Sequence, residues 1–136
     1  ENITDAENIA LAGEDVPVGQ YARKLFENIG NLDDVMAMEI NEGANVTAVL
    51  TAVAEGSCEV GTTYYSDTYG YEDKLDILQT VSYDLTGDVI YPICQVQNDE
   101  ADKTQTAAAK DFYKFVLSDK AKKVFDAYYF DTDVER

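Results

Sequence analysis

The stretch VPVGQYARKLFENIG, residues 16–30, predicts a helix and determines how the rest of the chain is interpreted. Its apolar residues recur at the spacing of one helical face, and they are Val18, Tyr21, Ala22, Leu25, Phe26 and Ile29. Pro17 suits the first helical position, where an N–H has no intrahelical partner, and Gly30 suits the end. Helix formation does not explain the glycine at position 19, because glycine destabilises a helix. Without a Cβ, it lets another group approach the backbone closely.

Strands and helices alternate around this segment. The apolar run Ile9–Leu11 predicts a buried strand before it, and the alternation from Met36 to Ile40 predicts a second strand after it. Apolar residues at helical spacing from Val46 to Val53 follow Asn45, a good N-cap, and predict a second helix. Glu59–Tyr65 predicts a third strand. The order indicates the α/β class with a largely parallel sheet, in which ligands bind beyond the carboxyl ends of the strands.

The second half of the chain predicts two further strands and then helices. The apolar runs Leu75–Tyr83 and Val89–Val96 are expected to be strands, with a turn at residues 86–88 between them. Two helical faces follow, separated by the N-cap Ser118. From about Ala107 onward these helices are expected to expose apolar residues, and the tail from residue 131 is polar.

Composition excludes several classes of function. The chain has 136 residues, 27 acidic and 10 basic, and its net charge of −17 argues against binding nucleic acid or an anionic membrane. It has no histidine, which excludes His-based triads, and its carboxylate pairs are interpreted as surface charge, so we expect no enzyme. No apolar stretch is long enough to span a membrane. Cys58 and Cys94 are either two buried thiols or one disulfide.

Three residues are candidates for an anion site. The backbone amide of Val18 points out of the first helix start, and Val46 opens the second helix in the same way. Tyr64, near the end of the third strand, could bring a hydroxyl to the same rim. Free N–H groups and the positive end of the helix dipole favour an anion. A site of donors only suits a fully deprotonated tetrahedral oxyanion, whereas protonated phosphate also needs an acceptor.

The motifs together resemble the periplasmic molybdate-binding proteins of ABC transporters. They are VPVGQYA at residues 16–22, Asn45-Val46, and GTTYYSD at residues 61–67, and the resemblance extends through VIYPICQV and the closing helical region. It implies a three-layer lobe of a type II periplasmic-binding-protein-like fold with C-terminal helices. It also implies that the amides of Val18 and Val46 and the hydroxyl of Tyr64 hold molybdate or tungstate, without a cofactor or a separate metal. Tyr65 competes with Tyr64 for the hydroxyl role.

The resemblance also implies how the chain is divided. Residues 1–88 would be the second lobe of a two-lobe solute-binding protein. Residues 89–136 would be a crossing strand and helices that return to a first lobe, and no part of this sequence resembles that first lobe. The whole protein would be periplasmic or extracellular, lipid-anchored through a segment upstream of Glu1, and would deliver the anion to a membrane permease. The exposed apolar face could pair with a second copy or exchange with it by domain swapping.

Three alternatives stay open at this point. The ligand could be sulfate or another small anion, because the sequence does not fix the size of the pocket. The same fold could serve as the sensing domain of a transcriptional regulator. A calcium site within residues 66–76 is disfavoured, because the acidic residues there lack the regular oxygen-ligand spacing of an EF-hand.

Overall fold

A computed structural model describes residues 2–133 of the chain. The chain forms two compact units, the first reaching to Val89 and the second beginning at Ile90. None of the described helices is long and apolar enough to cross a membrane.

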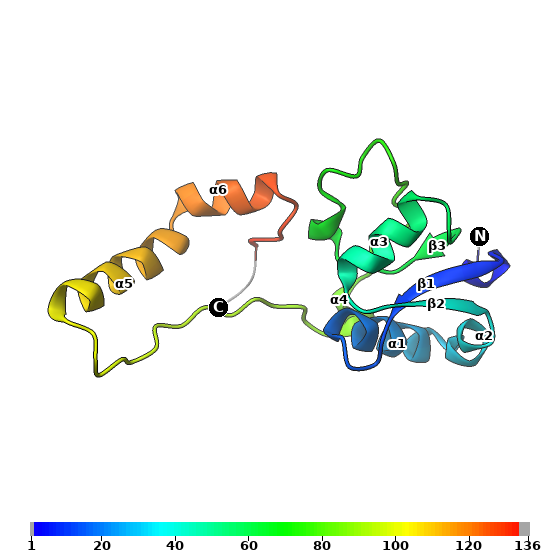
Figure 1. The fold of residues 1–136 in the computed structure, drawn as a ribbon, viewed down its shortest axis with the longest axis horizontal. Helices are drawn as coiled ribbons and strands as arrows, with labels where there is room; N and C mark the ends of the chain where they lie inside the picture. Colours follow the sequence, from blue (N-terminus) through cyan, green and yellow to red (C-terminus); the bar gives the residue numbers. More distant parts are fainter. Residues whose placement is uncertain (1, 134–136) are drawn as a thin grey trace. The chain divides into compact units, whose positions relative to one another are not determined.

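A parallel three-stranded sheet lies at the centre of the first unit (Figure 1). Its strands are β1 (Asn8–Ala12), β2 (Glu39–Gly43) and β3 (Val60–Gly61), in the order β2-β1-β3. β1 pairs with β2 along its whole length, from Asn8 opposite Glu39 to Ala12 opposite Gly43. β1 is thus the central strand, and the expected α/β class with a parallel sheet is confirmed.

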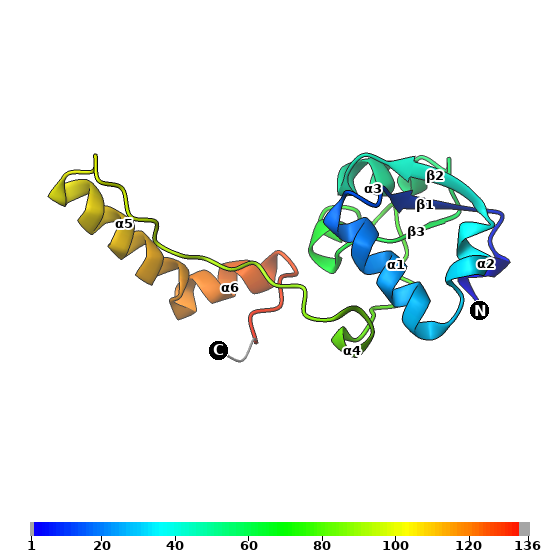
Figure 2. The same ribbon diagram turned by 90° about the horizontal axis from the view of Figure 1, so that it is seen from below.

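Helices cover both faces of this sheet, which gives the three layers expected (Figures 1 and 2). α1 (Pro17–Ile29) and α2 (Leu32–Met36) lie on one face, and α3 (Val46–Ala54) lies on the other. Successive side chains of β1 point to opposite faces. Ile9 and Leu11 therefore pack with Phe26, while Ala10 packs with Val49.

The ends of both long helices of this unit agree with the sequence. α1 begins at Pro17 and ends at Gly30, whose φ of 82° lies in the left-handed region that favours glycine. α3 begins after Asn45, whose side chain accepts a 2.9 Å hydrogen bond from the amide of Ala48. Two short 3-10 helices, η1 (Ile3–Asp5) and η2 (Tyr65–Thr68), and the one-turn helix α4 (Tyr83–Thr86) complete the unit.

One predicted strand of this unit is displaced along the chain and ends at Gly43 instead of Ile40, and another is shorter than expected. Met36 ends α2, so the second strand begins only at Glu39. β3 contains only Val60 and Gly61, which lie opposite Ile9 and Ala10, and Tyr65 begins η2.

The strands predicted at Leu75–Tyr83 and Val89–Val96 are wrong. Within the described residues, neither segment contains a strand, and the end of the first enters α4, which Gly87 terminates at a φ of 77°. An apolar extended segment becomes a strand only where a neighbouring edge accepts its backbone hydrogen bonds. Among the described residues, neither segment pairs with the outer edge of β2 or β3, each of which pairs with β1 alone.

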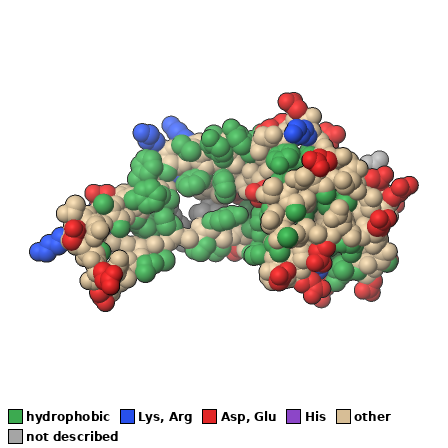
Figure 3. All heavy atoms as spheres, in the orientation of Figure 1, with side chains coloured by type: hydrophobic (Ala, Val, Ile, Leu, Met, Phe, Trp, Pro, Cys, Tyr) green, Lys and Arg blue, Asp and Glu red, His purple; other side chains and the backbone are tan. Residues whose placement is uncertain are grey.

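The second unit contains α5 (Lys103–Val116) and α6 (Asp119–Ala127). Asp102 and Gln105 form a capping box at the start of α5, and Ser118 caps α6 as predicted. Large apolar side chains lie exposed here, as expected: Phe112 is 63% exposed and Val124 54% (Figure 3). The last three residues of the predicted polar tail lie outside the described residues.

Gly19 is explained by a close approach of the chain to itself. A Cβ added at this position would lie 2.2 Å from the carbonyl oxygen of Gly13 and 2.4 Å from that of Ala12. The first turn of α1 therefore rests directly on the backbone at the carboxyl end of β1. The group that approaches Gly19 closely is therefore the protein's own main chain.

We predict that Gly19→Ala destabilises the first unit. Helix propensity alone would favour alanine by about 1 kcal/mol. The clash with two backbone carbonyls should outweigh this gain and lower the free energy of unfolding by about 1–3 kcal/mol. Urea denaturation followed by circular dichroism measures the difference. Glu27→Ala, at an exposed site of the same helix, is the control and should change stability by less than about 0.5 kcal/mol. Stabilisation by Gly19→Ala would contradict the close approach.

Candidate anion site

The start of α1 offers two backbone donors. Its N-cap is Val16, which has no side-chain group to accept from the first amides. The amide of Gln20 donates to the carbonyl of Val16 at 3.1 Å, so the regular helical bonds begin there. Pro17 has no N–H. The amides of Val18 and Gly19 are therefore the ones that the helix geometry leaves without an intrahelical partner.

The start of α3 also offers two backbone donors. The side chain of Asn45 accepts from Ala48, and the amide of Val49 donates to the carbonyl of Asn45 at 3.3 Å. The amides of Val46 and Thr47 come before these bonds and have no intrahelical partner. Two helix starts thus present four backbone N–H groups.

The packing brings the three predicted residues together. Val18 is 4% exposed and belongs to a buried cluster with Ala12 and Val49, and Val46 and Tyr64 pack against the same cluster. α1 begins after β1, α3 begins after β2, and Tyr64 follows β3, so all three come from the carboxyl ends of parallel strands (Figure 1). This is the position where open parallel sheets bind ligands.

Tyr64 is held in place by a second tyrosine. Its ring meets that of Tyr21 edge to face, with the centroids 6.3 Å apart. The hydroxyl of Tyr21 donates to the carbonyl of Asp88 at 3.4 Å. Tyr65, in contrast, lies in η2 with 47% of its surface exposed. The structure thus brings Tyr64 into the cluster of Val18 and Val46, and its contact with a ligand stays a prediction.

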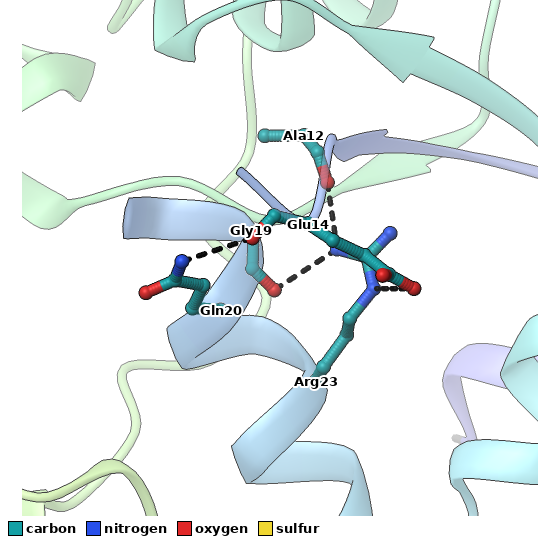
Figure 4. A network of polar contacts seen from close by, with 5 residues as sticks. All are labelled: Ala12, Glu14, Gly19, Gln20 and Arg23. Carbon is teal, nitrogen blue, oxygen red and sulfur yellow. Dashed lines mark hydrogen bonds and ion pairs between the residues drawn. The ribbon is translucent and has the colours of Figure 1, made fainter. Parts of the chain in front are cut away.

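Three backbone acceptors at this end of the sheet, the carbonyls of Gly43, Gly13 and Ala12, accept hydrogen bonds. The carbonyl of Gly43 accepts from the amide of Gly13 at 3.2 Å, and the carbonyl of Gly13 accepts from Val16 at 3.1 Å. The carbonyl of Ala12 accepts at 2.8 Å from Nη1 of Arg23 (Figure 4). The end of the sheet therefore offers N–H donors while its nearby carbonyls are engaged.

Sequence reasoning missed Arg23. Its Nη1 also donates to the carbonyl of Gly19 at 3.0 Å, so one nitrogen joins the end of β1 to the first turn of α1. The only signal in the sequence was the four-residue spacing from Gly19 to Arg23, which places both on one side of the helix. Two threonine hydroxyls after β3, those of Thr62 and Thr63, are also buried without a hydrogen-bond partner among the described residues.

The described residues hold no group of three or more side chains suited to binding a metal ion. Both cysteines are free, and the structure has Cys58 buried and Cys94 exposed. Burial raises the pKa of the Cys58 thiol. The disulfide left open by the sequence is not formed.

Known proteins with similar sequences and folds place this chain in a family. Residues 5–131 match the family described as bacterial extracellular solute-binding proteins. The chain belongs to this family. It is 32% identical over 130 residues to YvgL of Bacillus subtilis, which carries the name of an ABC transporter substrate-binding lipoprotein. It is 30% identical over 116 residues to ModA of Haemophilus influenzae, named a molybdate-binding protein.

Two solved structures share the fold. A substrate-binding domain from Clostridium difficile, named for a molybdenum ABC transporter, matches 94% of the chain with a TM-score of 0.76 and 28% identity. The periplasmic molybdate-binding protein of Azotobacter vinelandii matches 98% with a TM-score of 0.67 and 18% identity, a likeness of fold alone. The solute-binding-protein fold expected from the resemblance is confirmed.

The chain spans about half the length of these relatives. The aligned region is 95% of this chain but 48% of YvgL, and 85% of this chain but 42% of ModA. The matches cover 56% and 57% of the two solved chains. These relatives are named for binding or transport rather than for catalysis.

We predict that the two thiols differ strongly in reactivity. Iodoacetamide should alkylate Cys94 at least about tenfold faster than Cys58 in the native chain, because the thiolate reacts and burial disfavours it at Cys58. Peptide mass spectrometry of timed samples measures both rates. In Cys94→Ser only the slow reaction should remain. Equal rates, or no reaction before reduction, would contradict the burial and the free state of the thiols.

Proposed function

We propose that this chain binds a tetrahedral oxyanion, molybdate or tungstate, as part of an extracytoplasmic substrate-binding component of an ABC transporter. One observation carries the proposal: two helix starts with unpartnered amides, at Val18 and Val46, pack on one cluster at the carboxyl end of the sheet. The hydroxyl of Tyr64 would complete the set of donors. The names of ModA and of the solved relatives support the choice of ligand.

Neutral donors are sufficient for this binding. Each hydrogen bond to a charged group contributes about 1.5–3 kcal/mol, and helix starts add the favourable end of the dipole. A fully deprotonated oxyanion accepts on every oxygen, so a site without acceptors suits it. Sulfate has the same chemistry and is the alternative ligand, distinguished by size.

The remaining parts of the proposal concern the whole protein. Residues 1–88 would be the second lobe, and residues 89–136 would return to a first lobe that closes over the anion. A membrane permease would receive the ligand, and a lipid anchor would hold the protein outside the cytoplasm. The chain would bind without catalysis or a cofactor. A role as the sensing domain of a regulator is the second candidate.

The apolar face of the second unit would be covered in the whole protein. Phe112 and Phe115 on α5 and Val124 on α6 are 63%, 48% and 54% exposed. Burying such surface is worth about 25 cal/mol per Å². In the isolated chain, a second copy or a domain-swapped partner would cover this apolar face.

An NMR titration of the chain tests the site. Sodium molybdate, added to the 15N-labelled chain, should shift the amide signals of Val18 and Val46 along saturable curves, and sodium sulfate should shift them less. Weak binding is expected if the first lobe supplies the other donors, and chemical shifts detect weak binding. No shift at either amide in a folded chain, or saturable shifts only in the second unit, would contradict the proposal.

A pair of variants at Val46 tests the donor directly. Val46 is the first residue of α3, where proline is tolerated, and Asn45 before it is extended, at φ −165° and ψ 176°, rather than helical. Val46→Pro removes the N–H and should weaken molybdate binding about tenfold or more. Val46→Ala keeps the N–H and is the control, expected within about twofold of the parent chain. Equal affinities of the two variants would exclude this amide as a ligand donor.

A further inference from the structure

The proposed site contains a potential conflict between donors and acceptors. A fully deprotonated oxyanion can only accept hydrogen bonds, so a free carbonyl oxygen near it is repulsive. Two carbonyls, those of Ala12 and Gly13, lie against the first turn of α1, as the short distances from a Cβ built at Gly19 show. The amide of Val16 occupies the carbonyl of Gly13. The carbonyl of Ala12 needs another partner.

Arg23 is that partner (Figure 4). Its Nη1 lies 2.8 Å from the oxygen of Ala12 and 3.0 Å from the oxygen of Gly19. The side chain is 15% exposed, so its position is set by packing as well as by these bonds. A terminal nitrogen of guanidinium carries two N–H groups, which matches the two acceptors, one at the end of β1 and one in the first turn of α1.

The charge of Arg23 is only weakly offset. Its Nε lies 3.7 Å from a carboxylate oxygen of Glu14, whose side chain is 80% exposed, and such a pair contributes little in water. Only two other basic residues, Lys24 and Lys74, precede Ile90 in this acidic chain. Arg23 therefore places a partly buried positive charge beside the start of α1.

We propose that Arg23 is a positioning residue that makes the anion site selective for fully deprotonated oxyanions. By occupying the carbonyl of Ala12, it removes the acceptor that a protonated oxyanion would use, and it holds the first turn of α1 in place for the amide of Val18. Molybdate, which carries no proton at mildly alkaline pH, is then favoured over hydrogen phosphate, which carries one O–H donor. The inference rests on the proposed function, because it concerns the same site.

The test compares two ligands in variants of the chain. Dissociation constants for sodium molybdate and inorganic phosphate are measured at mildly alkaline pH by NMR titration of the parent chain, Arg23→Met and Arg23→Lys. Arg23→Met frees the Ala12 carbonyl while filling a similar volume, and molybdate binding should weaken about tenfold. Phosphate binding should weaken less, because the freed carbonyl accepts its O–H, so the preference for molybdate should fall by at least about fivefold.

Two variants serve as controls. Arg23→Lys keeps a charged donor and should recover part of the preference, although it lacks the planar geometry of arginine. Glu14→Gln removes the exposed carboxylate and leaves both Arg23 bonds, so the preference should stay within about twofold of the parent chain. Circular dichroism and urea denaturation show which variants fold. If Arg23→Met does not fold, the preference for molybdate over phosphate in Arg23→Lys, compared with that of the parent chain, decides the role of Arg23.

The outcomes separate the inference from the proposed function. A merely structural loss would weaken both ligands by the same factor, so an unchanged preference in folded Arg23 variants would overturn the role of Arg23 while the anion site stands. A parent chain that binds neither ligand would overturn the proposed function and, with it, the role of Arg23. A reduced preference, partly restored by lysine, supports the proposal.

Discussion

The close approach between the first turn of α1 and the carboxyl end of β1 is the constraint on which the site depends. It exists because position 19 has no Cβ, which would otherwise lie 2.2 Å from a backbone oxygen. The approach lets Val18, at the very start of α1, enter the buried cluster on the α3 side of the sheet. Without it, the two helix starts would not share one cluster.

This arrangement would allow a strongly acidic protein to hold an anion, as proposed. The net charge of −17 is spread over its surface, and exposed charges beyond about 8–10 Å are largely screened at physiological salt. Backbone amides at Val18 and Val46 are fixed in place by the helices that carry them, so they need little rearrangement to bind. The carbonyls beside them are engaged by Val16 and Arg23, which leaves donors facing the site.

The parts of the fold that depend on local chemistry could be predicted from the sequence. α1 and α3 follow from helical periodicity and from their ends, Pro17 and Gly30 for one and Asn45 for the other. The strands at Leu75–Tyr83 and Val89–Val96 could not be judged in this way, because a strand needs an edge to pair with and the sequence does not say whether one is present. The convergence of Val18, Val46 and Tyr64 followed from strand order and from the family resemblance. The role of Gly19 was foreseen only in part, and Arg23 not at all, because both depend on backbone atoms of another segment.

The central claim is that two helix starts and a tyrosine hydroxyl hold the oxyanion without a charged partner in contact. Anomalous diffraction from crystals of the chain grown with sodium tungstate tests it most directly, because tungsten gives a strong signal at its own position. We expect one tungstate whose oxygens lie about 2.7–3.2 Å from the amide nitrogens of Val18 and Val46, with the Tyr64 hydroxyl at a similar distance. Tungstate bound only to lysine side chains of the second unit, with none at the two helix starts, would contradict it.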